Sequence, residues 1–385
     1  IVGTKAQRRV QIAGVAEHNV VVTSYDLMRR DIDEYVEQDF ARVVLDEAQY
    51  IKNPLTQVAR AAKRLPAGVR FALTGTPIEN RLSELWSIFD FLMPGLLGTR
   101  ESFAKRFESP VEHAEGDSAA RLQALVSPFV LRRVKEDVVA DLPEKIEDTV
   151  MAQLTGEQRK LYLANQDRIA QQVQHRESSE FKKDKLKVLA ELTKLRQICC
   201  DPRLHYEDYK AGSAKLDTCM ELVHGALDGG HRILLFSQFT GMLDIIGKRL
   251  AKEDIAFLKL TGASSKESRA KMVAQFQAGK VPIFLISLKA GGVGLNLTAA
   301  DVVIHYDPWW NVAAQDQATD RAHRIGQQHT VTVYKLIAKD TIEERIMQMQ
   351  ESKRDLVNSV LGGDGISSAL FTREDVLALL GGDGR

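Results

Sequence analysis

The sequence predicts an α/β protein with two parallel-sheet domains, a helical segment between them and a further helix at the C-terminal end. In residues 1–95 and again in residues 213–340, short apolar runs rich in β-branched residues alternate with helical patterns, as is typical of sheets covered by helices. Residues 96–212 lack strand signals and are charged and helical in pattern, and residues 341–385 form a helix and tail. A chain of 385 residues is long enough for two or three domains, each with its own core.

In the first domain, three short apolar runs are predicted to be buried parallel strands. They are Val20–Thr23, Val43–Asp46 and Phe71–Thr74. Helical stretches at Leu55–Leu65 and Leu82–Met93 lie between and after these strands, and Pro94 with Gly95 then interrupts the pattern.

The helical segment carries an apolar stripe at every third position: Leu186, Leu189, Leu192, Leu195 and Ile198. This spacing predicts one broad apolar helix face. Cys199 and Cys200 end the stripe and are interpreted as core residues. With Cys219 they make three cysteines, too few for a disulfide scaffold, which favours a reducing cytosolic compartment.

In the second domain, five strands are predicted, at Ile233–Ser237, Phe257–Leu260, Ile283–Ser287, Val302–Tyr306 and Val331–Ile337. Helical stretches separate several of them, at Met242–Lys252, Lys266–Gln277 and Ala313–Arg324. Thr341 and Glu344 are then spaced as a capping box that begins a brace helix, and an amphipathic tail follows at Arg373–Leu380.

The charge balance limits how the chain can bind nucleic acid. Fifty-two Lys and Arg residues oppose fifty-two Asp and Glu residues, so the net charge is zero. Binding to nucleic acid must therefore use locally basic surfaces.

No apolar run approaches the roughly 18 residues of a membrane span, and no secretory signal opens the chain, so no membrane partner is expected.

The sharpest local signal is the sequence ARVVLDEAQYIKN. Its strand delivers Asp46 and Glu47 to the carboxyl end, where ligands bind in open parallel sheets. One carboxylate there can hold Mg²⁺ on nucleotide phosphates, and a second can orient or deprotonate the attacking water. The alternative from these residues alone is a pair of surface acids at a strand end.

Small residues follow two other predicted strands. Thr74 and Gly75 follow one strand in the first domain, and Gly292 and Gly294 follow another in the second, within LKAGGVGLN. Such residues let backbone N–H groups approach phosphate oxygens closely. An ordinary strand-to-helix turn explains the first pair equally well, and a Gly-rich loop by itself is weak evidence of phosphate binding.

Two arginines in QATDRAHRIGQ complete the set. On the predicted helix, Arg321 and Arg324 are three residues apart and share a face. Two guanidinium groups there can clamp phosphoryl oxygens, and an arginine finger supplied across a cleft can be worth roughly a thousandfold in rate. The alternative is a pair of surface salt bridges, each worth about 1 kcal/mol or less.

Together these segments resemble the Swi/Snf-type ATPases, the double-stranded-DNA translocases of helicase superfamily two, over nearly the whole chain. The segments that resemble family motifs Ib, II, III, IV, V and VI are, in order, Val22–Tyr25, Asp46–Gln49, Thr74–Asn80, Leu234–Phe239, Ser287–Asn296 and Gln317–Gln327. Phe129–Lys145 and Leu195–Leu204 are similar to family-typical stretches of the helical insertion. Gln49 stands where many members have His, Val312 stands where members usually have Pro, and the compact second lobe is most similar to bacterial members.

The resemblance implies two RecA-like lobes that face each other across a cleft holding ATP. In this arrangement Asp46 binds Mg²⁺, Glu47 activates water, and Arg321 and Arg324 complete the site when the cleft closes. The implied nucleotide contacts are Asp46, Glu47, Thr74, Gly75, Gly292, Gly294, Gln317, Arg321 and Arg324.

The resemblance also implies that double-stranded DNA lies across both lobes and is held through its phosphates. The implied DNA contacts are Thr23, Ser24, Tyr25, Ser237, Gln238 and Lys289. The motor is expected to be a monomer that can remodel a nucleoprotein complex. Its expected location is the cytoplasm, with nucleoid association in a bacterium, or the nucleus in a eukaryote.

The sequence departs from the family in that it contains no G-x-x-x-x-G-K-[ST]. In the family that phosphate-binding loop lies upstream of motif Ib, and this chain begins at Ile1 rather than Met. We therefore expect a chain truncated within or before lobe one, which alone binds ATP weakly and is inactive. The alternative is a non-catalytic nucleic-acid- or protein-binding module on a degenerate motor fold, and a strand-separating helicase is less favoured.

Overall fold

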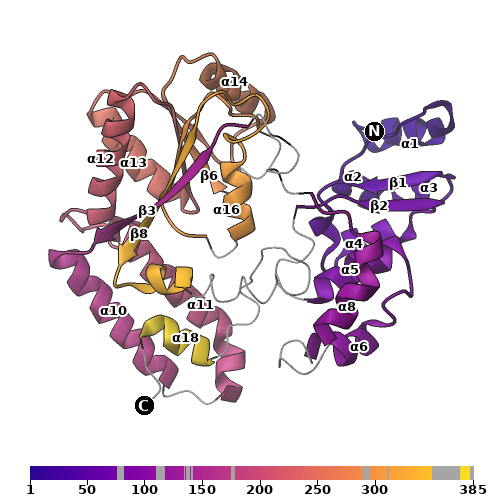
Figure 1. Ribbon diagram of the computed structural model, residues 1–385, viewed down its shortest axis with the longest axis horizontal. Coiled ribbons are helices and arrows are strands. Elements are labelled where there is room, and N and C mark those ends of the chain that lie inside the picture. The colour runs from indigo at the N-terminus through magenta and orange to yellow at the C-terminus, as the bar shows by residue number, and fades with distance from the viewer. Residues whose placement is uncertain are drawn as a thin grey trace. The chain divides into compact units, whose positions relative to one another are not determined.

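The protein divides into two compact units (Figure 1). The structure is a computed structural model that describes residues 1–75, 82–109, 118–133, 135, 139, 142–174, 178–288, 295–309, 312–348 and 373–381. Within these residues, unit 1 extends to Leu131 and unit 2 begins at Arg132. No helix in the described ranges has the length and apolar character needed to cross a bilayer.

Unit 1 contains a two-stranded parallel sheet and surrounding helices. Strand β1 (Arg42–Leu45) pairs with β2 (Val69–Ala72), with Val44 opposite Phe71. The helices are α1 (Lys5–Ala13), α2 (Tyr25–Arg30), α3 (Ile32–Tyr35), α4 (Gln57–Arg64), α5 (Leu82–Leu92), α6 (Arg100–Phe103) and α8 (Ser118–Val126). Shorter helical turns are η1 (Val15–Glu17), η2 (Ala48–Ile51), the π-helical η3 (Ala104–Glu108) and η4 (Ser127–Phe129).

Helix α5 joins two apolar cores of unit 1. Its residue Ile88 belongs to a core with Leu45 at the end of β1, whereas Phe89, the next residue, belongs to a core with Phe103 and Leu122. An apolar helix whose residues are buried nearly all round can serve both cores at once. The first core positions the carboxyl end of β1.

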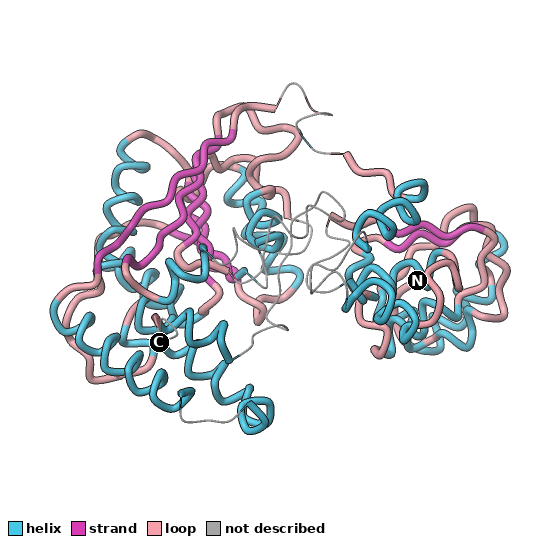
Figure 2. Tube along the Cα trace, turned by 60° about the horizontal axis from the view of Figure 1, so that its bottom comes forward, coloured by secondary structure: helices cyan, strands magenta, loops and turns pink. Residues whose placement is uncertain are grey.

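Unit 2 is built on a six-stranded parallel sheet (Figure 2). The strand order is β3-β8-β7-β4-β6-β5. The strands are β3 (Lys145–Gln153), β4 (Ile233–Ser237), β5 (Phe257–Leu260), β6 (Ile283–Ser287), β7 (Val302–His305) and β8 (Val331–Lys339). Because all pairs are parallel, their carboxyl ends meet at one edge.

Helices cover both faces of this sheet (Figure 1). Side chains alternate along β4, so Leu235 packs in a core with α12 and α13 whereas Leu234 packs in a core with Phe276 of α14 and Ala318 of α16. The helices of unit 2 are α10 (Gly156–Gln174), α11 (Ser178–Cys200), α12 (Ala214–Asp228), α13 (Thr240–Lys252), α14 (Lys266–Gln277), α16 (Val312–Thr319) and α18 (Arg373–Leu380), with a turn η5 (Pro202–Leu204) and a helix at 342–348.

A third core in unit 2 confirms the predicted apolar stripe from Leu189 to Ile198, whereas the side chain of Leu186 lies outside the described residues. Leu192, Leu195 and Ile198 of α11 pack with α10, α18 and the helix at 342–348. Cys199 and Cys200 are fully buried, as predicted. At the start of the helix at 342–348, the capping contacts are displaced by one residue from a capping box: Asp340 N–H donates to Glu344 and Glu343 N–H donates to Thr341.

Two strand predictions were wrong. Val20–Thr23 is not a strand in the structure, and both Val20 and Val22 are more than two-thirds exposed. Residues 96–212, predicted to contain no strand, include β3, which pairs along its whole length with β8. The sequence of β3 gives little apolar signal because it is an edge strand with mostly polar, partly exposed residues.

The predicted helical segment also does not form one body. Helices α6 and α8 pack with α5 in unit 1, whereas α10 and α11 belong to unit 2. The division between the units, at Leu131, therefore lies inside residues 96–212.

Candidate nucleotide and nucleic-acid site

The first cluster of predicted site residues lies at the carboxyl end of β1. Asp46 is exposed there and Glu47 is half-buried. Glu47 adopts a left-handed backbone conformation with φ of 52°, which is uncommon for residues other than Gly and tends to occur at functional sites. Its N–H donates to Asp46 Oδ1 at 3.0 Å.

A hydrogen-bonded chain connects Glu47 to the neighbouring strand end. The Gln49 amide donates from Nε2 to Glu47 Oε2 at 2.7 Å, and Thr74 Oγ1 donates to Gln49 Oε1 at 2.8 Å. The backbone reinforces this link, because Ala48 N–H donates to the carbonyl of Leu73 at 2.8 Å. Both ends of the Gln49 amide are therefore engaged, which orients the Glu47 carboxylate. The sequence alone assigns no role to Gln49, since only the fold brings it to Thr74.

Tyr25 connects the predicted DNA-binding segment to the same strand end. Its hydroxyl donates to the Asp46 carbonyl at 2.8 Å, and its ring stacks on Tyr50 at 5.1 Å. Burial, followed by the charges of Asp46 and Glu47, raises the pKa of Tyr25, so the phenol remains a donor. Ser24 is exposed and caps α2 by accepting from Leu27 N–H, and Thr23 precedes it.

The residues at this strand end fit a magnesium ion on a nucleotide. Asp46 offers an exposed carboxylate, and Thr74 and Gly75 lie at the end of the adjacent strand, with open space around Gly75. Mg²⁺ in nucleotide sites is held by one or two carboxylates, phosphates and water. The donor set at the end of β1 is of this kind.

In unit 2, the segments that follow β4 and β7 are joined. Ser237 is fully buried at the end of β4, and its hydroxyl donates to Asp307 Oδ1 at 2.5 Å. This burial corrects the expectation that Ser237 contacts DNA, because a side chain without exposed surface cannot touch a duplex outside the unit. Gln238 is half-buried and donates its backbone N–H to Asp307 Oδ2 at 3.3 Å.

The two predicted arginines do not share a helix face. Helix α16 ends at Thr319, so Arg321 and Arg324 lie in the turns that follow, the first buried and the second exposed. Beyond the end of the helix, the backbone carbonyls accept hydrogen bonds from donors other than the helical N–H groups. The Arg321 carbonyl accepts from Leu297 N–H at 2.9 Å, and the Ala322 carbonyl accepts from the Gln327 amide at 3.1 Å.

His323, one of the two residues between the arginines, is held by the backbone that precedes β3. His323 is buried, and its Nε2 lies 2.8 Å from the carbonyl of Pro143, just before β3. Gln317, another predicted nucleotide contact, is half-buried on α16. The predicted contacts Lys289, Gly292 and Gly294, and most of Thr74–Asn80, lie outside the described residues.

Comparison with known families shows which family the chain belongs to. Residues 1–204 match the SNF2-related domain family, and residues 214–326 match the helicase conserved C-terminal domain family. The first match covers more than half of the chain. The chain belongs to the SNF2 family.

Relatives of this SNF2 chain occur in bacteria and in humans. The putative ATP-dependent helicase/translocase YwqA of Bacillus subtilis is 41% identical over 92% of the chain and 39% of its own length. An ATP-dependent helicase of Mycoplasma pneumoniae is 40% identical over 94% of the chain and 34% of its own length. Human TATA-binding protein-associated factor 172 is 36% identical over 95% of the chain and 23% of its own length. The chain thus spans a third or so of its bacterial relatives.

Solved structures agree with the SNF2 assignment. The Sulfolobus solfataricus SWI2/SNF2 ATPase core domain is 37% identical, with a TM-score of 0.52, over 95% of this chain and 76% of that one. The same core in complex with dsDNA is 38% identical, with a TM-score of 0.50, over 90% and 74%. The predicted resemblance and the predicted fold class, two parallel-sheet RecA-like lobes, are confirmed.

Proposed function

We propose that this chain is part of an ATP-dependent motor that moves along double-stranded DNA, with ATP hydrolysed at the carboxyl end of β1. The observation that carries the proposal is the chain of hydrogen bonds from Glu47 through Gln49 to Thr74. A pair of ordinary surface acids needs no such support, whereas a general base must be held in one orientation. The likeness to a SWI2/SNF2 core solved with dsDNA supports DNA as the track.

In this motor, Asp46 holds Mg²⁺, which neutralises charge on the nucleotide phosphates when bound. Glu47 accepts a proton from the attacking water, and Gln49 keeps its carboxylate in place. Arg324, with Arg321, stabilises phosphoryl oxygens. The remaining nucleotide contacts are Thr74, Gly75, Gly292, Gly294 and Gln317.

DNA is bound through its phosphates by Thr23, Ser24, Tyr25, Gln238 and Lys289. The affinity should fall as salt rises and should depend little on sequence. The motor acts as a monomer and remodels nucleoprotein complexes. The 385-residue chain contains no G-x-x-x-x-G-K-[ST], so calorimetry on this chain alone should show no micromolar affinity for ATP.

The test is Glu47→Gln in the full-length protein. Turnover of ATP in the presence of duplex DNA should fall by about a hundredfold or more, because general base catalysis is lost. The DNA affinity should stay within about threefold, since Glu47 touches no DNA. Glu37→Gln, at an exposed glutamate of the same unit, is the matched control.

Three outcomes separate the candidates. Full turnover in Glu47→Gln would remove the role of this carboxylate. Turnover that persists in Arg324→Ala would remove the role of that arginine. A wild-type protein that binds DNA or protein without hydrolysing ATP would instead establish the non-catalytic binding module.

A further inference from the structure

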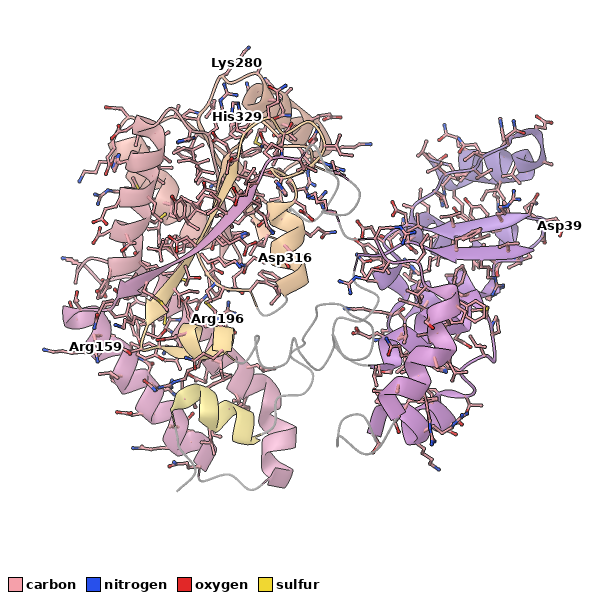
Figure 3. The ribbon with its side chains drawn as sticks, viewed as in Figure 1. Asp39, Arg159, Arg196, Lys280, Asp316 and His329 are labelled. Atoms are coloured by element: carbon pink, nitrogen blue, oxygen red, sulfur yellow. The ribbon has the colours of Figure 1, made fainter. Side chains whose placement is uncertain are left out.

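A buried arginine of unit 2, Arg196, lies within the family-typical stretch Leu195–Leu204 and is not one of the expected nucleotide or DNA contacts. Arg196 lies near the end of α11 (Figure 3). It is only 1% exposed and is among the largest of the fully buried side chains in the described part of the protein. Its Nη1 donates to Gln238 Oε1 at 3.1 Å, and its Nη2 donates to the carbonyl of Pro308. The guanidinium also lies over the ring of Phe239, 5.9 Å from its centre.

The two acceptors come from different loops. Residues 238–239 follow β4 and residues 307–309 follow β7, which are adjacent parallel strands. We call these segments the two strand-end loops. Both therefore lie at the edge of the sheet where ligands bind in open parallel sheets.

Further bonds hold the two strand-end loops together. Asp307, which is fully buried, accepts from the Ser237 hydroxyl and the Gln238 N–H. Trp309 N–H donates to Gln315 Oε1 on α16 at 3.3 Å. Arg196 connects α11 to both loops, so three parts of unit 2 meet at its guanidinium.

The chemistry of this contact requires arginine. Burying a cationic side chain costs free energy unless its donors are satisfied, and apolar residues often give equal or greater stability at such positions. A guanidinium directs separate N–H donors to two acceptors in a fixed geometry, whereas a lysine ammonium is a flexible point charge. Because an apolar side chain could give equal stability here, the burial of Arg196 indicates that the arginine serves to fix the positions of the two strand-end loops.

We propose that Arg196 is a positioning residue that holds the two strand-end loops in the arrangement that binds DNA. The inference rests on the proposed function, in which Gln238 contacts the duplex. Arg196 itself is buried and touches no DNA. It makes the long helix α11 part of the support for the DNA-binding edge of unit 2.

The test uses Arg196→Lys and Arg196→Gln in the full-length protein. The glutamine variant keeps one donor without a charge and serves if the lysine variant does not fold. The DNA concentration for half-maximal stimulation of ATP turnover should rise about tenfold, the effect expected of losing one charge-assisted hydrogen bond. Turnover at saturating DNA should stay within twofold. Arg203→Lys, at an exposed arginine bonded to Asp201, is the matched control and should change neither quantity.

A double-mutant cycle distinguishes positioning from simple stability. If Arg196 acts through Gln238, then Gln238→Ala combined with Arg196→Lys should be no worse than the more impaired single variant. Hydrogen exchange should quicken at the amides of Gln238 and Trp309 but not in the centres of β4 and β6.

The outcomes that overturn the inference are distinct. Additive effects in the cycle, unchanged DNA dependence, or a fall in maximal turnover equal to the loss of DNA affinity would each overturn the role of Arg196 alone. A wild-type protein whose ATP turnover ignores DNA would overturn the proposed function and this inference with it.

Discussion

The two units bury their parallel strands very differently. In unit 2, all five residues of β4 and all five of β6 are buried, with helices on both faces. In unit 1, the cross-strand pair Val44 and Phe71 is 54% and 46% exposed, and Val69 and Leu73 beside it are about half exposed. Strands β1 and β2 each carry one arginine among four residues, whereas β4 and β6 carry no charged residue, so the difference in burial follows the composition of the strands in part.

The proposed catalytic base and the more extensively buried sheet lie in different units. The proposed base, Glu47, lies at the end of the partly covered sheet of unit 1. The described residues of unit 2 form three cores and include a fully buried ion pair between Lys215 and Glu343. Segments with fewer buried apolar contacts open at lower free energy. We therefore expect unit 2 to be the more stable unit, and the following experiments test that comparison in the 385-residue chain.

The largest effect is expected from Lys215→Met in unit 2. Lys215 Nζ lies 2.5 Å from Glu343 Oε2, and both side chains are 0% exposed. The variant leaves a buried carboxylate without its counter-charge, which should lower the free energy of unfolding by about 4 kcal/mol, measured by denaturant titration. Restoration of stability by Glu343→Leu in the same chain would support this cause. Lys259→Met, at the exposed pair with Asp244, should cost less than about 1 kcal/mol.

A matched pair of phenylalanine substitutions compares the two sheets directly. Phe284 in β6 is 0% exposed and Phe71 in β2 is 46% exposed. Phe284→Ala removes a filled core volume and should cost about 3 kcal/mol of unfolding free energy. Phe71→Ala should cost less, about 1 kcal/mol, since nearly half of Phe71 is exposed. Equal losses in thermal or denaturant unfolding would contradict the comparison.

A smaller, pH-dependent effect is expected from His305 in unit 2. Burial lowers the pKa of His305 to about 3 from its ordinary 6.5, and the ring stacks on Phe236 while Nε2 lies 2.8 Å from Thr319 Oγ1. The folded state keeps this ring neutral while the unfolded state takes up a proton below about pH 6.5. The unfolding free energy should therefore decrease as the pH is lowered from 6.5 to 3. At pH 5 the decrease due to His305, relative to neutral pH, should be roughly 2 kcal/mol.

His305→Gln isolates that contribution. Glutamine keeps a side-chain partner for Thr319 and has no proton to gain, so the variant should lose less stability between pH 7 and pH 5 than the wild type does. An identical pH dependence in both proteins would show that other groups control the acid sensitivity of unit 2.

Much of the fold followed from patterns along the chain. The strand at Ile283–Ser287 and the helix at Lys266–Gln277 have the predicted bounds, because an apolar strand between turns and a helix that begins after an N-cap serine, Ser265, have clear local signals. The polar edge strand β3 has no such signal and depends on β8 for its pairing. Val20–Thr23 has an apolar signal but no strand partner in the described part of unit 1.

The candidate site shows the same division. Asp46 and Glu47 could be identified by their place after an apolar strand, but the link from Gln49 to Thr74 joins residues 25 positions apart. Arg196 and Gln238 are 42 positions apart, and no pattern in the sequence predicts the hydrogen bond between them. The helix expected to carry Arg321 and Arg324 ends early, and the carbonyls that follow bind other donors: Leu297 N–H, from a distant segment, and the side chain of nearby Gln327.

The sequence by itself determined the family, the alternation of strands and helices, and the carboxylates at the end of β1, since each of these is expressed in local order and spacing. Only the tertiary structure decided which unit each part of residues 96–212 joins, how Glu47 is held, and that a buried arginine connects two strand-end loops. The physical reason is that an amphipathic helix or a polar side chain specifies that it needs a partner, whereas the folded backbone decides which partner lies within reach.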